Sequence, residues 1–129
     1  RGRREINKHY IKINKMKITK VAETSIQDTP HKVDVRLLYD HETAQAVHIT
    51  LQPGETLKRH ITPVDVFFYI LEGTPTVHIG DQEETVAVDS LVESPKDIVH
   101  HLSNKSTQVA RILVVKAPKP EGKAKARLL

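Results

Sequence analysis

The stretch RHITPVDVFFYILEG, residues 59–73, is the most informative segment of the sequence about the fold. It begins with a polar segment around His60, passes through Pro63, and enters an uncharged run from Val66 to Leu71. β-Branched and aromatic residues occupy both parities of this run, which is typical of a strand buried on both faces. A Glu-Gly pair ends it. The stretch therefore predicts a strand that has a histidine at its entrance and needs cover on two sides.

Shorter segments with period-two patterning lie on both sides of this strand. QPGE reads as a turn, and GDQE, between PTVHIG and ETVAVD, predicts a hairpin. Residues 33–117 hold about eight short strands at a spacing of about ten residues, with no amphipathic helix. The pattern predicts an all-β domain, either a sandwich or a small barrel. The expected strands lie within residues 33–39, 46–51, 56–62, 66–71, 75–80, 84–89, 90–94, 97–104 and 108–118.

Composition is that of a single soluble domain. The chain has 129 residues, 38% of them hydrophobic and 28% charged, and it has no cysteine. Disulfides and thiolate metal sites are therefore excluded. No apolar run approaches the length of a membrane span and no signal-peptide pattern is visible, so we expect a cytoplasmic protein without membrane contact.

The positive charge belongs to the two ends of the chain. Residues 1–20 carry eight Lys and Arg against one acid, and residues 117–129 carry four against one, whereas residues 21–116 have a net charge of −6. We expect a basic N-terminal extension over residues 1–15, a barrel domain over 16–117 and a basic tail over 118–129. Basic ends could bind nucleic acid, but the interior lacks a basic stripe with interleaved aromatics, which argues against it.

Two turns that each lead into a strand carry a histidine. Gly54 precedes His60 by six positions, and Pro95 precedes His100 by five, with Asn104 following. If the two strands are neighbours in a barrel, both imidazoles can face the same mouth. Such a pair can bind a metal or hydrogen-bond an organic ligand, and the sequence leaves these alternatives open.

These segments resemble the two motifs of the cupin family, G-x5-H-x-H-x3/4-E-x6-G and G-x5-P-x-G-x2-H-x3-N, over about residues 40–116. Gly54, His60 and Gly73 match the first motif, and Pro95, His100 and Asn104 match the second. Thr62 replaces the second His of the first motif, and Val66 replaces its Glu. Asp89 and Asp97 occupy the two glycine positions of the second motif. The resemblance implies a double-stranded β-helix, or jelly-roll barrel.

The family places a divalent metal in the open mouth of this barrel, held by three His and one Glu. Imidazole and carboxylate suit Zn, Ni, Fe, Mn or Cu. Here the resemblance leaves only His60 and His100 as ligands, with His78, His48 and Thr62 as candidates to complete the set. Two imidazoles are fewer than the three protein ligands of catalytic zinc sites. The expected ligand pocket comprises His60, Thr62, His100, Lys58 and Phe68.

The remaining histidines have no motif support. His101 should face away from His100, and Asp65 should face outward, because neighbouring residues of a strand point to opposite faces. His9, His31 and His41 are interpreted as surface residues. Lys58 shares a face with His60 if the alternation is strict.

Two functions follow. The chain is either a metal-dependent cupin that acts on a small polar molecule through His60 and His100, or a metal-free, non-catalytic cupin module that binds a small molecule. The missing Glu and His leave open whether it is an enzyme. The outward face of residues 66–71 is apolar, so we also expect a homodimer, as is common in cupins.

Overall fold

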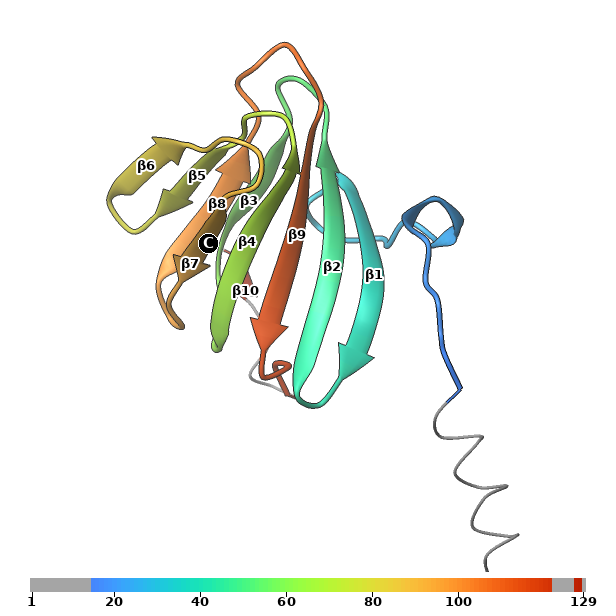
Figure 1. The fold of residues 1–129 in the computed structure, drawn as a ribbon. Coiled ribbons are helices and arrows are strands. Elements are labelled where there is room, and N and C mark those ends of the chain that lie inside the picture. The colour runs from blue at the N-terminus through green and yellow to red at the C-terminus, as the bar shows by residue number, and fades with distance from the viewer. Residues whose placement is uncertain (1–14, 122–126, 129) are drawn as a thin grey trace, which may run out of the picture.

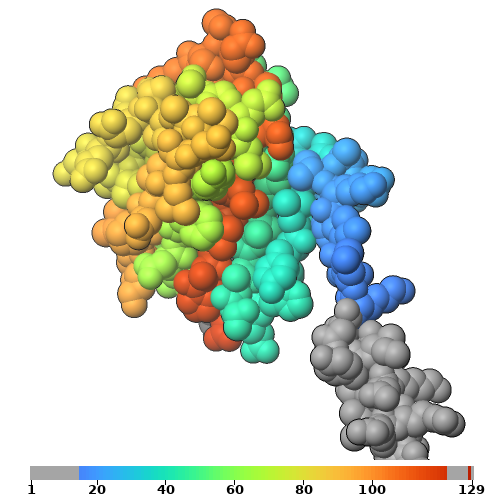
Figure 2. All heavy atoms as spheres, viewed as in Figure 1, coloured from blue at the N-terminus to red at the C-terminus, as the bar shows by residue number. Residues whose placement is uncertain are grey.

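The structure, a computed structural model, describes residues 15–121 and 127–128. Nearly all of the expected N-terminal extension, residues 1–14, lies outside this range. Residues 15–20 are extended and exposed, and they lead into the short 3-10 helix η1 (Val21–Glu23). Figure 2 shows this segment standing out beside the barrel. Within the described ranges no helix is long and apolar enough to cross a membrane.

Two five-stranded antiparallel sheets form the domain (Figure 1). The first sheet has the order β1 (Asp34–His41), β2 (Ala44–Leu51), β9 (Ala110–Ala117), β4 (Asp65–Glu72) and β7 (Leu91–Ser94). The second has the order β10 (Arg127–Leu128), β3 (Thr56–Ile61), β8 (Val99–Ser103), β5 (Thr76–Ile79) and β6 (Gln82–Thr85). The chain passes repeatedly between the sheets, so strands distant in sequence become neighbours. The predicted all-β, jelly-roll architecture is confirmed.

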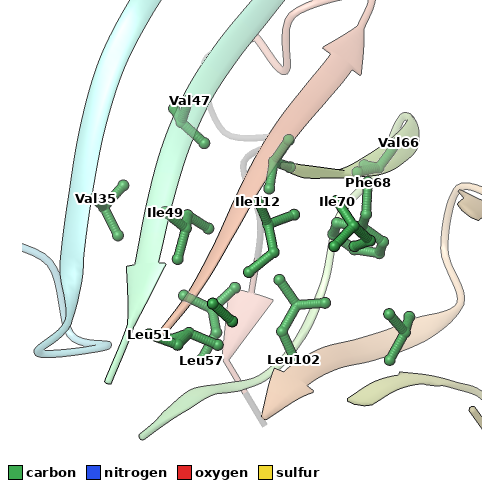
Figure 3. Packing of buried hydrophobic residues seen from close by; sticks show 13 residues of the cluster. Val35, Val47, Ile49, Leu51, Leu57, Val66, Phe68, Ile70, Leu102 and Ile112 are labelled. Atoms are coloured by element: carbon green, nitrogen blue, oxygen red, sulfur yellow. The ribbon is translucent and has the colours of Figure 1, made fainter. Parts of the chain in front are cut away.

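The core lies between the two sheets, where alternate residues of each strand face inward (Figure 3). Strand β4 shows this directly, because Val66, Phe68 and Ile70 are buried while Phe67 and Tyr69 are half-buried on the other face. The first sheet contributes most of the apolar core. Its members are Val35, Val47, Ile49, Leu51, Leu57, Val66, Phe68, Ile70, Val77, Leu102, Ala110, Ile112 and Val114.

The hairpin between β5 and β6 turns earlier than expected. Ile79 pairs with Gln82, so Gly80 and Asp81 form a two-residue turn, and β6 covers Gln82–Thr85 instead of residues 84–89. Gly80 has a φ of 57°, which only glycine adopts without strain. The position of this glycine, rather than the hydrophobic pattern after it, therefore sets the register.

The C-terminal segment also differs from its expected description as a tail. Arg127 and Leu128 form β10, which pairs with Ile61 and His60 at the edge of the second sheet. A strand of two residues is too short to be recognised in the sequence by a period-two pattern. The pairing places Leu128 next to the histidine at the entrance of the first motif's strand.

The glycine positions of the second motif keep their backbone conformation although glycine is absent. Asp89 and Asp97 both have a φ of 65°, in the left-handed region that glycine favours. Asp tolerates this region better than most residues because its short side chain can bond locally. The loop paths of the motif are therefore retained with a different residue type.

Candidate functional site

A cavity of about 680 Å³ opens between the two sheets, next to His60 and His100. Its apolar wall comes mainly from β1, β2, β4 and β9, and the segment 27–31 lies along its rim. The polar side chains that line it nearest to the two histidines are His31, Thr62 and Lys116. The volume is in the range of pockets that take small organic molecules.

His60 and His100 lie directly opposite each other on the paired strands β3 and β8. Their Nε2 atoms are 3.1 Å apart, and their ring centroids are 4.5 Å apart. Ser94 Oγ lies 2.6 Å from His100 Nδ1, and the Lys58 carbonyl oxygen lies 2.7 Å from His60 Nδ1. The predicted convergence of the two imidazoles in one cavity is what the geometry shows.

These contacts assign the tautomers of both rings. A carbonyl oxygen only accepts, so His60 Nδ1 carries a proton and donates to Lys58, which leaves His60 Nε2 as an acceptor. His100 Nε2 must then donate to it, and Ser94 Oγ donates to His100 Nδ1. Every ring nitrogen of the pair is thus engaged in a hydrogen bond.

Both rings are neutral at physiological pH. Burial lowers the pKa of His100 most strongly, with smaller contributions from His60 and Lys116, to about 3. Burial also lowers the pKa of His60, and the hydrogen bond to the Lys58 carbonyl partly opposes this shift. A proton on either ring would break the hydrogen-bond chain and place a charge in an apolar setting.

A bulge in β3 leaves the side chain of Lys58 exposed, while its backbone N–H and carbonyl contact two of the histidines that line the cavity. The pairing with β8 shifts between Leu57 and His60, and both of these residues face inward. The expectation that the Lys58 side chain faces the pocket is wrong for this reason, because Lys58 is exposed and does not line the cavity. Its carbonyl instead holds His60, and its N–H donates to His31 Nδ1 at 2.9 Å.

His31 is a lining residue and not the surface residue that the sequence suggested. Its ring lies 5.1 Å from that of His60, and burial lowers its pKa to about 4, so the ring is neutral. Because its Nδ1 accepts from Lys58, the proton is on Nε2. Among the hydrogen bonds of the described residues, none engages this Nε2–H.

Lys116 provides a cation inside the same cavity. It follows Ile112 and Val114 on the inward face of β9, and it lies opposite Val66, the residue at the glutamate position of the family motif. Burial lowers its pKa from the usual range of lysine. Within residues 15–121 and 127–128, no carboxylate forms an ion pair with it.

The donor set does not fit the metal that the cupin resemblance implies. The two imidazoles already accept or donate at every nitrogen, Val66 offers no oxygen, and the charge of Lys116 repels a cation. In the described part of the chain, no cluster of three or more His, Cys, Asp or Glu side chains is arranged to hold a metal ion.

The other candidate residues divide between the cavity and the outer faces. Thr62 and Phe68 line the cavity, Thr62 Oγ1 lies 3.2 Å from His100 Nε2, and Phe68 packs edge-on against that ring. His78 lies on the outer face of the second sheet, stacked on His101 and bonded to Ser103.

His48 lies on the outer face of the first sheet, where its Nε2 accepts from Arg111. Neither His78 nor His48 can complete a metal site with His60 and His100, because each points away from the space between the sheets.

Sequence reasoning missed three residues of this site, namely Ser94, Lys116 and His31. Two of them carried a usable signal, because Ser94 follows inward-facing Val92, and Lys116 continues the inward series of β9. Strict alternation applied to the ends of these strands would have placed both inside. His31 lies in a loop, and no periodicity predicts the path of a loop.

Comparisons with known proteins agree with this architecture. The family description of the cupin domain matches residues 47–116, more than half of the chain. No functionally curated protein matches.

Among solved structures, the TT1209 protein of Thermus thermophilus is 28% identical with a TM-score of 0.70, and the match covers 81% of this chain and 100% of that one. A double-stranded β-helix protein of Klebsiella pneumoniae is 17% identical with a TM-score of 0.73, covering 88% and 97%. The polyketide cyclase RemF of Streptomyces resistomycificus is 18% identical with a TM-score of 0.73, covering 88% and 85%. At these last two identities the likeness shows the fold alone.

Proposed function

The chain belongs to the cupin domain family, and from this premise we propose that it is a metal-free cupin that binds a small organic molecule between its two sheets. The observation that carries the proposal is the hydrogen-bond chain from Ser94 through His100 and His60 to the Lys58 carbonyl. This series of hydrogen bonds engages every imidazole lone pair of His60 and His100, so none is left to bind a metal. It holds the two rings as a fixed polar wall beside the apolar cavity.

The polar wall and the apolar wall together suit a ligand of mixed character. Phe68, Val114 and Leu37 offer apolar contact, while Thr62 and His31 offer hydrogen bonds. Pockets of this size with a few fixed polar groups bind small organic molecules and derive orientation from those groups. The buried network is preorganised, so ligand binding does not require the rings to be reoriented.

Elemental analysis tests the metal-free half of the proposal. Protein purified without chelator or metal resin should contain far less than one equivalent of any transition metal. Addition of Zn, Ni, Mn or Fe should leave its thermal midpoint unchanged, because a ligand stabilises a protein only by binding the folded state. One equivalent of metal that is lost in His60→Ala and retained in His78→Ala would overturn it.

Ligand-observed NMR with a fragment library tests the binding half. Leu37 and Leu38 are neighbours of similar burial, and only Leu37 lines the cavity. Leu37→Trp should therefore abolish the binding of fragments that Leu38→Trp retains. Equal binding by both variants would show that the fragments bind elsewhere and would contradict the proposal, and thermal melts establish that both variants fold.

A further inference from the structure

We infer that the ligand of this cavity is a small monocarboxylate with an apolar body, and that Lys116 and His31 recognise its carboxylate. The inference rests on the proposed function and adds the chemical class of the ligand. It starts from the hydrogen-bonding capacity that the protein itself leaves unused.

Hydrogen-bond donors dominate the part of the cavity next to His60 and His100. The Lys58 N–H fixes His31 Nδ1 as an acceptor, so His31 Nε2 carries the proton, and no described residue accepts it. Thr62 Oγ1 lies 3.2 Å from His100 Nε2, which already carries the hydrogen donated to His60 and cannot accept one, so the Thr62 O–H remains available to a ligand. Lys116 adds an ammonium group. A ligand that satisfies these groups must supply acceptors.

The acceptors near Lys116 are already engaged. Lys116 lies across from Gln45 in the register of β2 and β9, and Gln45 lies across from Asp40. The Asp40 carboxylate pairs with Lys119 at 2.7 Å and accepts from Gln45 at 3.3 Å. Asp40 therefore does not neutralise Lys116. No described residue neutralises Lys116, and an anionic ligand would supply the missing partner, because an unpaired charge at a half-buried position is unfavourable.

The charge of the cavity favours a single negative charge on that anion. The charged and titratable groups that line it are Asp28, His31, Asp40, His60, His100, Lys116 and Lys119. The three imidazoles are neutral at physiological pH, and Asp40 and Lys119 cancel each other. Asp28 is exposed and forms no ion pair with Lys116, so Lys116 is the one cation that the described residues leave unpaired on the inner wall. A carboxylate carries the single negative charge that neutralises Lys116, whereas a phosphate dianion would keep one negative charge without a partner.

The remaining lining requires an apolar body. Val35, Leu37, Val47, Ile49, Leu57, Val66, Phe68, Val114 and Leu128 form most of the wall. Val66 lies directly across from Lys116, so apolar surface begins next to the ammonium group. A carboxylate at Lys116 therefore directs a chain or ring toward this apolar wall.

Matched acid and amide pairs test the inference by calorimetry. Benzoate with benzamide and hexanoate with hexanamide differ little in shape and differ in charge. The wild-type protein should bind each acid about tenfold more tightly than its amide, as expected for a charge-assisted contact. Lys116→Met should remove this preference, and Lys96→Met, at an exposed position away from the cavity, should keep it. Lys116→Arg should restore at least part of it.

A stability measurement guards against misfolding of the main variant. Lys116→Met removes an unpaired charge from a partly buried position, so its thermal midpoint should equal or exceed that of the wild type. Loss of the acid preference together with a retained midpoint therefore reports recognition.

Three outcomes overturn the inference. The first is an acid preference that survives in Lys116→Met, and the second is a failure of either acid to bind the wild type at millimolar concentration. Amides and acids that bind equally, with binding abolished by Leu37→Trp, would refute the carboxylate assignment while supporting the pocket itself.

Discussion

Each imidazole of the His60–His100 pair acts through both of its nitrogens. His60 is held by a backbone carbonyl on one side and by His100 on the other, and His100 is held by Ser94. Fixed tautomers of this kind make the rings rigid hydrogen-bonding groups rather than mobile bases. The pair therefore shapes the cavity in the absence of any ligand.

Stability of the domain should fall in mild acid because of these rings. The pKa of His100 is about 3 in the folded protein, whereas histidine in an unfolded chain titrates near 6.5. Between these values the unfolded chain binds more protons, so the contribution of His100 is complete above about pH 6.5 and decreases as the pH falls toward 3. At pH 5 the loss should be about 2 kcal/mol. Urea unfolding at pH 7 and pH 5 measures it.

A substitution separates the contribution of His100 from those of the other histidines whose pKa values are lowered. His31 and His101, whose pKa values are lowered to about 4, add to the same slope. His100→Gln keeps an acceptor toward Ser94 and a donor toward His60 but has no titratable ring. The slope between pH 7 and pH 5 should therefore decrease in this variant. An unchanged slope would mean that His100 is not the main acid-sensitive group.

The individual strands show which features of the fold the period-two pattern predicts. Alternation located the long strands β2, β4 and β9 correctly, since each buries one parity against the core. It failed at Lys58, because the bulge in β3 adds a residue and reverses the facing of the residues after it. A bulge depends on tertiary pairing with β8, which the local sequence does not encode.

The motif residues also show which features the sequence predicts and which it does not. Resemblance to a family identified His60 and His100, and the two glycine-position aspartates kept the loop conformation. It also implied a metal that the donor set does not fit. The decisive residue is Lys116, which belongs to neither motif and acts only through its place opposite Val66.

The turn at Asp97 holds a backbone conformation that glycine adopts with less strain. Asp97 has a φ of 65°, which is strained for a side chain that has a Cβ, and its N–H donates to the Thr62 carbonyl at 2.9 Å. Asp97→Gly should relieve this strain without losing the bond. After allowing for the greater freedom of glycine in the unfolded chain, we expect the free energy of unfolding to rise by about 0.5 kcal/mol. Thermal denaturation measures the change.

Gly73 is a position where replacing the glycine should destabilise the domain, in contrast to Asp97→Gly. It has a φ of 80°, and a Cβ added there would collide with the backbone of Val109 and Ala110. Gly73→Ala should therefore lower the free energy of unfolding by at least about 2 kcal/mol. A loss of stability in Asp97→Gly would show that the aspartate side chain itself supports its turn.

Across the whole molecule, the outer face of the first sheet carries an apolar patch. Phe67 lies across from Val115, and Tyr69 lies across from both Leu113 and Leu91, of which Leu91 is 51% exposed. Arg111 and Glu72 pair at 3.6 Å beside this patch. A patch flanked by opposite charges can complement itself about a two-fold axis. We propose that a second copy of the chain covers it.

Light scattering after size exclusion tests the dimer. The wild type should have the mass of a dimer at micromolar concentration. The double variant Leu91→Glu with Leu113→Glu should be a monomer at the same concentration, because it places like charges in the apolar patch, and these repel across a two-fold interface. Ile98→Lys, an exposed apolar residue outside the patch, should remain dimeric. A monomeric wild type contradicts the proposal.

The pairing of β10 with β3 has a practical consequence for these experiments. Leu128 lies opposite His60 and lines the cavity, so any segment fused after it begins beside the binding site. A polyhistidine tag placed there would bring additional imidazoles next to His60 and His100, and together they could capture a metal through the tag. Tags for affinity purification therefore belong at the other end of the chain. A small fluorophore attached after Leu128 would, by the same proximity, be positioned to report when the cavity is filled.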